Sequence, residues 1–159
     1  MGTFWKSLSF YSKGTLAALC AVLIFSACAT LSPSSVLTPA EHLNLAIAYE
    51  YDGKLDLALR EYERAAVGEM RSRARTGQGN VLLSREQWPE AESSYRAALK
   101  ADPENVIALN NLAWMLARQN RLLDEAEQLI RQAIDLAPTP IEPYWNTLQT
   151  VLEARQVKP

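Results

Sequence analysis

One thirteen-residue pattern occurs three times in this chain and constrains the fold more than any other feature. The copies lie at residues 58–70, 91–103 and 126–138. Each begins with alanine, followed four residues later by a bulky side chain and seven residues later by another alanine; the bulky residues are Tyr62, Tyr95 and Ile130. These offsets place the three side chains on one face of a helix. Because a short stripe of small residues cannot bury itself, the pattern predicts a stack of similar helices.

The helices that pair with these copies have recognisable start and stop signals. Thr38 can cap a helix with its side chain, Pro39 suits the first helical position, and Glu41 can bond back to the backbone of Thr38. Gly53 suits the left-handed conformation in which helices commonly end. A second capping box is expected at residues 139–142. Together these signals predict seven helices: the first alanine-rich helix after Leu55 and six others at about residues 38–51, 69–85, 88–100, 105–119, 122–136 and 140–156.

The spacing between the paired helices is regular. Small residues in the first helix of each pair precede the alanine of the second helix by 12, 12 and 13 residues, and these alanines are 33 and 35 residues apart. The small residues are Ala46, Gly79 and Ala113, and the alanines are Ala58, Ala91 and Ala126. With this spacing the chain resembles the tetratricopeptide-repeat family. The unit of that family has 34 residues, a leucine–small–aromatic first helix and an Ala…Tyr/Phe…Ala…Pro second helix.

The resemblance covers residues 39–138 and implies an all-α, right-handed solenoid of three repeats, at about residues 39–70, 71–104 and 105–138. The chain departs from the family pattern at Met70, where the family has proline, and near Leu122, where one extra residue is present. The final helix, at about residues 140–156, is expected to cap the array. Its apolar side is predicted to contain Trp145, Leu148, Val151 and Leu152.

The N-terminal region has the three-part plan of a secretory signal. Residues 1–13 carry two lysines and no acid, residues 15–25 are apolar, and the small residues Ser26 and Ala27 precede Cys28. A run of eleven apolar residues rises only about 16 Å as a helix, roughly half of a hydrocarbon core of ~30 Å. A permanent membrane span is therefore the weaker interpretation.

Residues 25–28, Phe-Ser-Ala-Cys, resemble the lipobox of bacterial lipoproteins. The resemblance implies a cleaved signal peptide at residues 1–27, acyl chains such as palmitate on Cys28, a flexible tether within residues 28–37 and a folded domain at residues 38–159. Ala29, in place of aspartate after the cysteine, implies the outer membrane of a bacterial envelope, with the domain facing the periplasm. The alternative is an uncleaved anchor in which Cys28 has no special role.

Few residues of this chain suit catalysis or metal binding. His42 is the only histidine, and the two cysteines, Cys20 and Cys28, both lie in the N-terminal region. A two-histidine metal site and a disulfide within the folded domain are therefore excluded, and a conventional Ser-His-Asp arrangement has no spare candidate beyond His42. We expect a surface or packing role for His42, and we expect no enzymatic activity, metal, cofactor or small-molecule substrate.

The charge of the chain gives no case for nucleic-acid binding. Of 16 basic residues, Lys6 and Lys13 lie in the N-terminal region, so the rest of the chain carries 14 basic and 18 acidic residues. A mildly acidic domain has no general electrostatic attraction for polyanions.

What remains is a binding surface, because the first helices of a right-handed stack of pairs line its concave side. The positions there that the core does not need are Leu43, Ile47, Glu50, Tyr51, Arg73, Thr76, Asn80, Leu83, Asn110, Trp114 and Arg118. The partner-binding groove is predicted to consist of Ile47, Tyr51, Arg73, Asn80, Asn110, Trp114 and Arg118. Apolar residues would anchor the partner, asparagines would pair with its backbone and arginines with its carboxylates. The alternative is that Trp114 and Ile47 complete the core.

These features predict a non-catalytic protein-interaction scaffold. By resemblance to small repeat lipoproteins that help assemble pili, secretins or outer-membrane machinery, the partner is expected to be a peptide or helix of another envelope protein. Two alternatives stay open: an adaptor that regulates peptidoglycan hydrolases or proteases, and a self-associating structural lipoprotein. Family members that clamp a C-terminal carboxylate carry lysine and asparagine on the first concave helix. Because Leu43 and Ile47 stand there in this chain, that ligand class is not expected.

Overall fold

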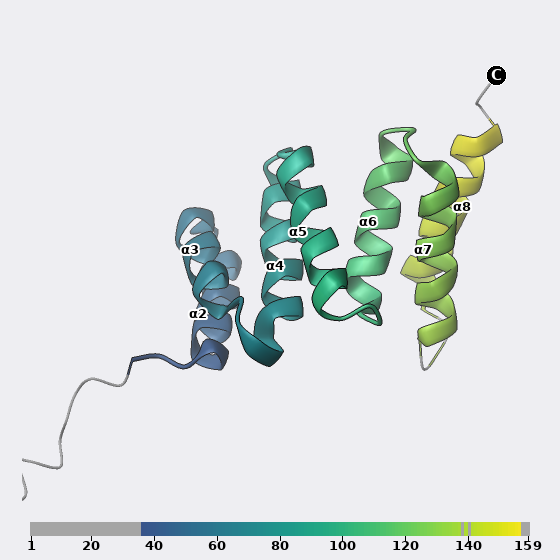
Figure 1. The fold of residues 1–159 in the computed structure, drawn as a ribbon. Coiled ribbons are helices and arrows are strands. Elements are labelled where there is room, and N and C mark those ends of the chain that lie inside the picture. Colours follow the sequence, from purple (N-terminus) through teal and green to yellow (C-terminus); the bar gives the residue numbers. More distant parts are fainter. Residues whose placement is uncertain (1–35, 138, 140, 157–159) are drawn as a thin grey trace, which may run out of the picture. The chain divides into compact units, whose positions relative to one another are not determined.

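The computed structural model describes residues 36–137, 139 and 141–156, so that Cys28 and the predicted signal peptide lie outside the described residues. Within those ranges the chain is helical and contains no strand, as predicted (Figure 1). The elements are α2 (Pro39–Tyr51), α3 (Leu55–Ala65), the 3-10 helix η1 (Gly68–Met70), α4 (Arg71–Ser84), α5 (Trp88–Ala101), α6 (Val106–Arg118), α7 (Leu123–Leu136) and α8 (Glu142–Gln156).

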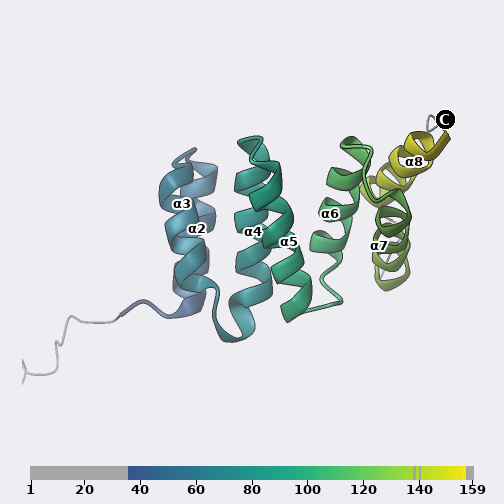
Figure 2. The ribbon, with the colours of Figure 1, turned by 45° about the horizontal axis from the view of Figure 1, so that its top comes forward.

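The helices associate in consecutive pairs. The first pair is α2 with α3, the second is α4 with α5, and the third is α6 with α7. The second helix of each pair packs on the first helix of the next, α3 on α4 and α5 on α6, while α8 packs on both α6 and α7. Figures 1 and 2 show these pairs side by side in chain order. The prediction of three helix pairs followed by a single C-terminal helix is confirmed.

The predicted start of the first helix is present in full. The backbone N–H of Glu41 donates to Thr38 Oγ1 at 3.3 Å, and the backbone N–H of Thr38 donates to Glu41 Oε2 at 2.7 Å. Pro39 occupies the first helical position. Hydrogen bonds from the backbone and side chain of Thr38 hold the pKa of the Glu41 carboxyl below its usual range.

The turn inside each pair uses a residue in the left-handed region, with φ of 72° at Gly53, 60° at Glu86 and 51° at Asn120. The third turn has a second such residue, Leu122, with φ of 47°, directly before α7. The extra residue of this repeat is thus accommodated by a second residue in the left-handed conformation. After the first pair, where the family proline is replaced by Met70, the chain turns at Gly68, with φ of 52°, and through η1.

The last helix begins later than predicted. The capping box at residues 139–142 implied a helix from residue 140, whereas α8 begins at Glu142. Pro143 gives the physical reason, because in a helix that began at residue 140 its nitrogen would have to donate the first backbone hydrogen bond, and proline has no N–H. With Pro143 in the first turn, the first N–H of the helix to find a backbone partner is that of Tyr144, which donates to the Ile141 carbonyl at 3.0 Å.

The repeated alanines are core residues, as the stacked-helix prediction requires. All six are fully buried: Ala58, Ala65, Ala91, Ala98, Ala126 and Ala133. Two buried tyrosine rings lie against glycines of α4, Tyr62 against Gly77 and Tyr95 against Gly79. A Cβ atom on Gly79 would lie 2.6 Å from a ring carbon of Tyr95, and one on Gly77 would overlap the Tyr62 ring. The two glycines therefore serve close helix packing.

The buried side chains form two separate clusters rather than one continuous core. The N-terminal cluster consists of Leu43, Ala46, Ala58, Tyr62, Ala65, Ala66, Ala74 and Val81, from the first pair and one side of α4. The C-terminal cluster extends from Ala91 and Tyr95 in α5 to Val151 in α8. The boundary between them runs through the second pair.

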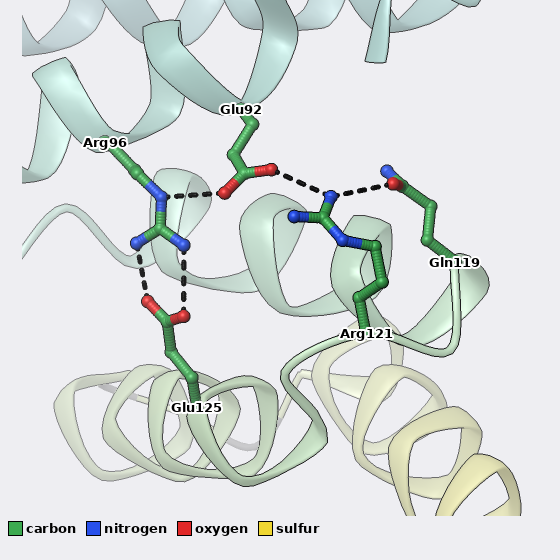
Figure 3. A network of polar contacts seen from close by, with 5 residues as sticks. All are labelled: Glu92, Arg96, Gln119, Arg121 and Glu125. Atoms are coloured by element: carbon green, nitrogen blue, oxygen red, sulfur yellow. Dashed lines mark hydrogen bonds and ion pairs between the residues drawn. The ribbon is translucent and has the colours of Figure 1, made fainter. Parts of the chain in front are cut away.

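A network of ion pairs joins the second helix pair to the third (Figure 3). Glu92 and Arg96, four residues apart on α5, form an ion pair at 2.9 Å. Arg96 also donates to both oxygens of Glu125 on α7, at 2.6 and 3.0 Å, and Arg121 donates to Glu92 at 3.2 Å. The hydrogen bonds from Arg96 hold the pKa of Glu125 below its usual range. The ion pairs thus link successive repeats as well as neighbouring turns of one helix.

The C-terminal helix is a less complete cap than predicted. Leu148 and Val151 are buried, but Trp145 is 50% exposed and Leu152 is 38% exposed. The buried face is formed by Tyr144, Leu148 and Val151, so the other two apolar residues lie on an adjacent face. None of the described helices is long and apolar enough to cross a membrane.

Candidate functional site

A pocket of about 480 Å³ lies where α2, α4 and the α5–α6 turn converge. Leu43 and Ile47 of α2 form one wall, and α4 lines it between them and the turn. The residues that line it are Leu43, Ile47, Tyr62, Arg73, Thr76, Gly77, Asn80, Asp102, Glu104, Asn105, Val106 and Ile107. The pocket is therefore shared by three successive repeats and exists only because they stack.

Asn105 fixes the turn that closes one side of the pocket. Its Oδ1 accepts from the backbone N–H of Ala108 at 3.0 Å and caps α6. Its Nδ2 donates to Ser72 Oγ at 2.8 Å and to Thr76 Oγ1 at 3.1 Å, both on α4. The Asn105 side chain thus caps the N-terminus of α6 and holds this helix against α4 of the preceding repeat.

The side of the pocket formed by α4 combines bare backbone with polar side chains. Gly77 brings bare backbone against the Tyr62 ring, while Arg73, Thr76 and Asn80 bring polar groups to the pocket. Thr76 is buried, and its hydroxyl donates to the Ser72 carbonyl at 2.9 Å. Arg73 is exposed and brings a guanidinium cation to the pocket.

A chain of hydrogen bonds connects α5, α4 and α6, beginning at Tyr95. The Tyr95 hydroxyl donates to Asn80 Oδ1 at 2.9 Å, and Asn111 Nδ2 donates to the same oxygen at 2.8 Å. Asn110 Nδ2 then donates to Asn111 Oδ1 at 3.0 Å. The chain orients Asn80, whose oxygen is fully used, so its amide nitrogen is the group that can serve a ligand. Burial raises the pKa of the Tyr95 hydroxyl, which therefore remains a neutral donor.

The structure brings three of the predicted groove residues together and separates the other four from them. Ile47, Arg73 and Asn80 line the same pocket. Asn110 and Trp114 line a second cavity with α8, and Arg118 lines a third, also with α8. Tyr51 is 92% exposed and is not among the residues lining any of these cavities.

Trp114 is partly a core residue and partly a surface residue, so it combines the two roles considered for it, a groove anchor and a part of the core. Its ring is partly buried and packs against the C-terminal core cluster, and the Arg118 guanidinium lies 5.9 Å from the ring centroid. Ile47 is 47% exposed and does not complete the core. Leu43, in contrast, is a buried core residue whose surface also forms part of the pocket wall.

The α5–α6 turn contributes pocket residues that the sequence analysis did not assign: Asp102, Glu104, Asn105, Val106 and Ile107. A signal for Ile107 was available, because it stands one 34-residue unit after Arg73. No such signal marks the turn carboxylates, whose placement depends on how the turn folds over α4.

His42 has the packing role expected for it. Its Nδ1 lies 2.6 Å from Glu61 Oε2, and the same carboxylate accepts from Arg64. Glu61 is buried, so these partners compensate the cost of removing its charge from water. Within the described residues, no group of three His, Cys, Asp or Glu side chains has the arrangement to hold a metal ion.

Comparison with known sequences identifies the repeats. A family model described as "Tetratricopeptide repeat" matches residues 76–139. The chain is also similar to two Drosophila melanogaster proteins named as protein O-mannosyl-transferases. It is 33% identical to Tmtc1 over 103 residues, which is 61% of this chain and 12% of that protein, and 39% identical to Tmtc2 over 66 residues, 42% of this chain and 7% of that protein. The chain thus spans about an eighth, or less, of these relatives.

Solved structures with a similar fold cover more of the chain. The first repeat domain of Spaghetti (RPAP3), bound to the HSP90 peptide SRMEEVD, superposes with a TM-score of 0.66 at 17% identity, covering 74% of this chain and 93% of that chain. The second domain of human RPAP3, in complex with the HSP70 peptide SGPTIEEVD, gives 0.61 at 17% identity, over 72% and 98%. The Yersinia enterocolitica type III secretion chaperone SycD, in complex with a peptide of the translocator YopD, gives 0.63 at 19% identity, over 77% and 99%.

Proposed function

Because this chain belongs to the tetratricopeptide-repeat family, we propose that its helical domain is a non-catalytic scaffold that binds a segment of a partner protein. One observation carries the proposal: the pocket shared by three repeats has two accessible isoleucines on its walls and polar groups on α4 between them. Ile47 and Ile107 are 47% and 54% exposed on α2 and α6, respectively. Apolar anchors beside fixed polar groups are the usual composition of a site that binds a peptide.

Structural neighbours of low sequence identity support a peptide as the ligand. Each of the three described above was solved with a peptide of another protein. Two of those peptides end in EEVD and are acidic. The wall of the pocket in this chain has Leu43 and Ile47 on α2, so the partner segment need not share that acidic terminus.

The proposed site can be tested with a photocrosslinking amino acid in the full-length protein, expressed in the cells that produce it. With p-benzoylphenylalanine in place of Ile107, ultraviolet light is expected to give discrete crosslinked species of higher mass. The variant Ile47→Asp should reduce their yield about tenfold, because it removes an apolar anchor of roughly 1.5 kcal/mol from the opposite wall. Immunoblotting and mass spectrometry of the adducts provide the measurement.

Ser93, an exposed residue of α5 that does not line the pocket, supplies the matched control position for the crosslinker. Adducts that form equally from position 93, or that persist unchanged in the Ile47→Asp variant, would show that partners bind another surface.

We further propose that the protein is a lipoprotein of the bacterial envelope, attached through Cys28, and that its partner is another envelope protein. The support is the sequence before the helical domain: two lysines, an apolar run and small residues directly ahead of Cys28. Metabolic labelling with an alkyne analogue of palmitate should mark the full-length protein. Cys28→Ala should lose the label and accumulate as precursor, whereas Cys20→Ala should keep it. Unchanged labelling of Cys28→Ala contradicts the proposal.

A further inference from the structure

The sign of the charge in the pocket points to the chemistry of its partner, if the pocket binds a protein segment as proposed above. Asp102 and Glu104 line the pocket from the α5–α6 turn and are both exposed. Neither forms an ion pair with any of the described residues, whereas the carboxylates of Glu92, Glu125 and Glu127 are all paired with arginine. The turn therefore presents two negative charges that the domain itself does not neutralise.

The turn holds these carboxylates in a defined position. Asp102 Oδ1 accepts from the backbone N–H of Glu104 at 3.0 Å. Asn105, the next residue, is bound to both Ser72 and Thr76 of α4. Because the backbone on which both acids lie is fixed by these bonds, a ligand would not have to order the turn when it binds.

The balance of charge around the pocket is negative. Among the described residues that line the pocket, Arg73 is the one cation, against two carboxylates. A third carboxylate, that of Glu50 on α2, accepts from the hydroxyl of the pocket residue Tyr62. A pocket with this balance attracts cationic groups and repels acidic ones.

Apolar surface lies beside the acidic turn. Ile107 of α6 lies three residues after Glu104 and is more than half exposed. Ile47 of α2 lines the same pocket. We propose that the pocket binds a partner segment in which a lysine or arginine lies next to an aliphatic residue. The aliphatic side chain enters between Ile47 and Ile107, and the cationic side chain pairs with Asp102 and Glu104.

A random nonapeptide library displayed on phage can test this proposal against the immobilised full-length protein. The selected pool is expected to be enriched in lysine or arginine adjacent to leucine, isoleucine or valine. A synthetic peptide from that pool should bind the variant Asp102→Asn/Glu104→Gln about tenfold more weakly than the wild-type protein, and its binding should weaken as salt is added. Asparagine at position 102 keeps an oxygen to accept from Glu104, so the turn should be retained.

The matched control is the variant Glu90→Gln/Asp135→Asn, which loses the same number and kinds of charge at exposed positions outside the pocket. It should bind the peptide with wild-type affinity. A second control, Ile47→Asp, shows whether a selected peptide occupies the pocket at all.

The outcomes distinguish this inference from the proposed function on which it rests. Peptides that need Ile47 but are neutral or acidic, or that ignore the loss of Asp102 and Glu104, overturn the inference and leave the pocket as a binding site. A pool in which no peptide depends on Ile47 overturns the proposed binding site itself.

Discussion

Replacing Tyr95 by alanine is expected to lower the free energy of unfolding by about 4 kcal/mol, the largest effect of any single substitution considered for this domain. The Tyr95 ring is fully buried, belongs to the C-terminal core cluster and lies against Gly79. Its loss leaves a cavity between α4 and α5 that glycine cannot fill. Urea denaturation followed by circular dichroism would give the value.

Tyr95→Phe is the matched control, because it keeps the ring and removes only the hydroxyl that donates to Asn80. Asn80 Oδ1 still accepts from Asn111, so the expected loss is only about 1 kcal/mol. If alanine and phenylalanine proved equally destabilising, the ring would not be the main contribution of this residue.

Gly79→Ala is expected to destabilise the domain by up to about 2 kcal/mol, although alanine is the better helix former. In an open helix the substitution would stabilise by about 1 kcal/mol. Here the new Cβ would lie 2.6 Å from a ring carbon of Tyr95 and 2.8 Å from another, and the buried ring has little room to move. Overpacking of this kind costs typically 1–3 kcal/mol, which outweighs the gain in helix propensity.

The sign of the Gly79→Ala effect should reverse when the ring is absent. In the Tyr95→Ala background the added methyl group meets empty space, so Gly79→Ala should stabilise the protein by about 0.5–1 kcal/mol. The four denaturation curves of this double-mutant cycle provide the measurement. A destabilising effect of the same size in both backgrounds would mean that Gly79 is required for a reason other than the ring.

The helix pairing could be predicted from sequence because small residues recur at fixed offsets. Ala58, Ala91 and Ala126 are all fully buried, and α2, whose N-cap is Thr38, has the predicted capping box. These features depend on local backbone geometry and on a stripe that only stacking can bury, both of which are visible in the order of residues.

The features that sequence analysis missed depend on contacts between distant segments. The exposure of Trp145, for example, depends on which face of α8 meets α6 and α7. No local pattern determines this outcome.

Only part of the candidate site could be predicted from sequence, because the rest depends on contacts between distant segments. Ile47, Arg73 and Asn80 follow from the helical register of α2 and α4. Trp114 shares that register, but α8 lies beside it and makes a separate cavity. Asp102 and Glu104 enter the pocket through a turn whose path is set by the bonds of Asn105 to α4, which sequence periodicity does not encode.

The division of the buried side chains into two clusters has a consequence for the order in which the domain opens. The apolar cluster of the first pair and one side of α4 shares no member with the cluster that extends from α5 to α8, so we expect α2 and α3 to open while the C-terminal cluster stays intact. The pocket crosses this boundary, with Leu43 in one cluster and Val106 packed against the other. A bound partner would therefore contact residues of both clusters at once, and amide hydrogens of α2 are expected to exchange more slowly in its presence.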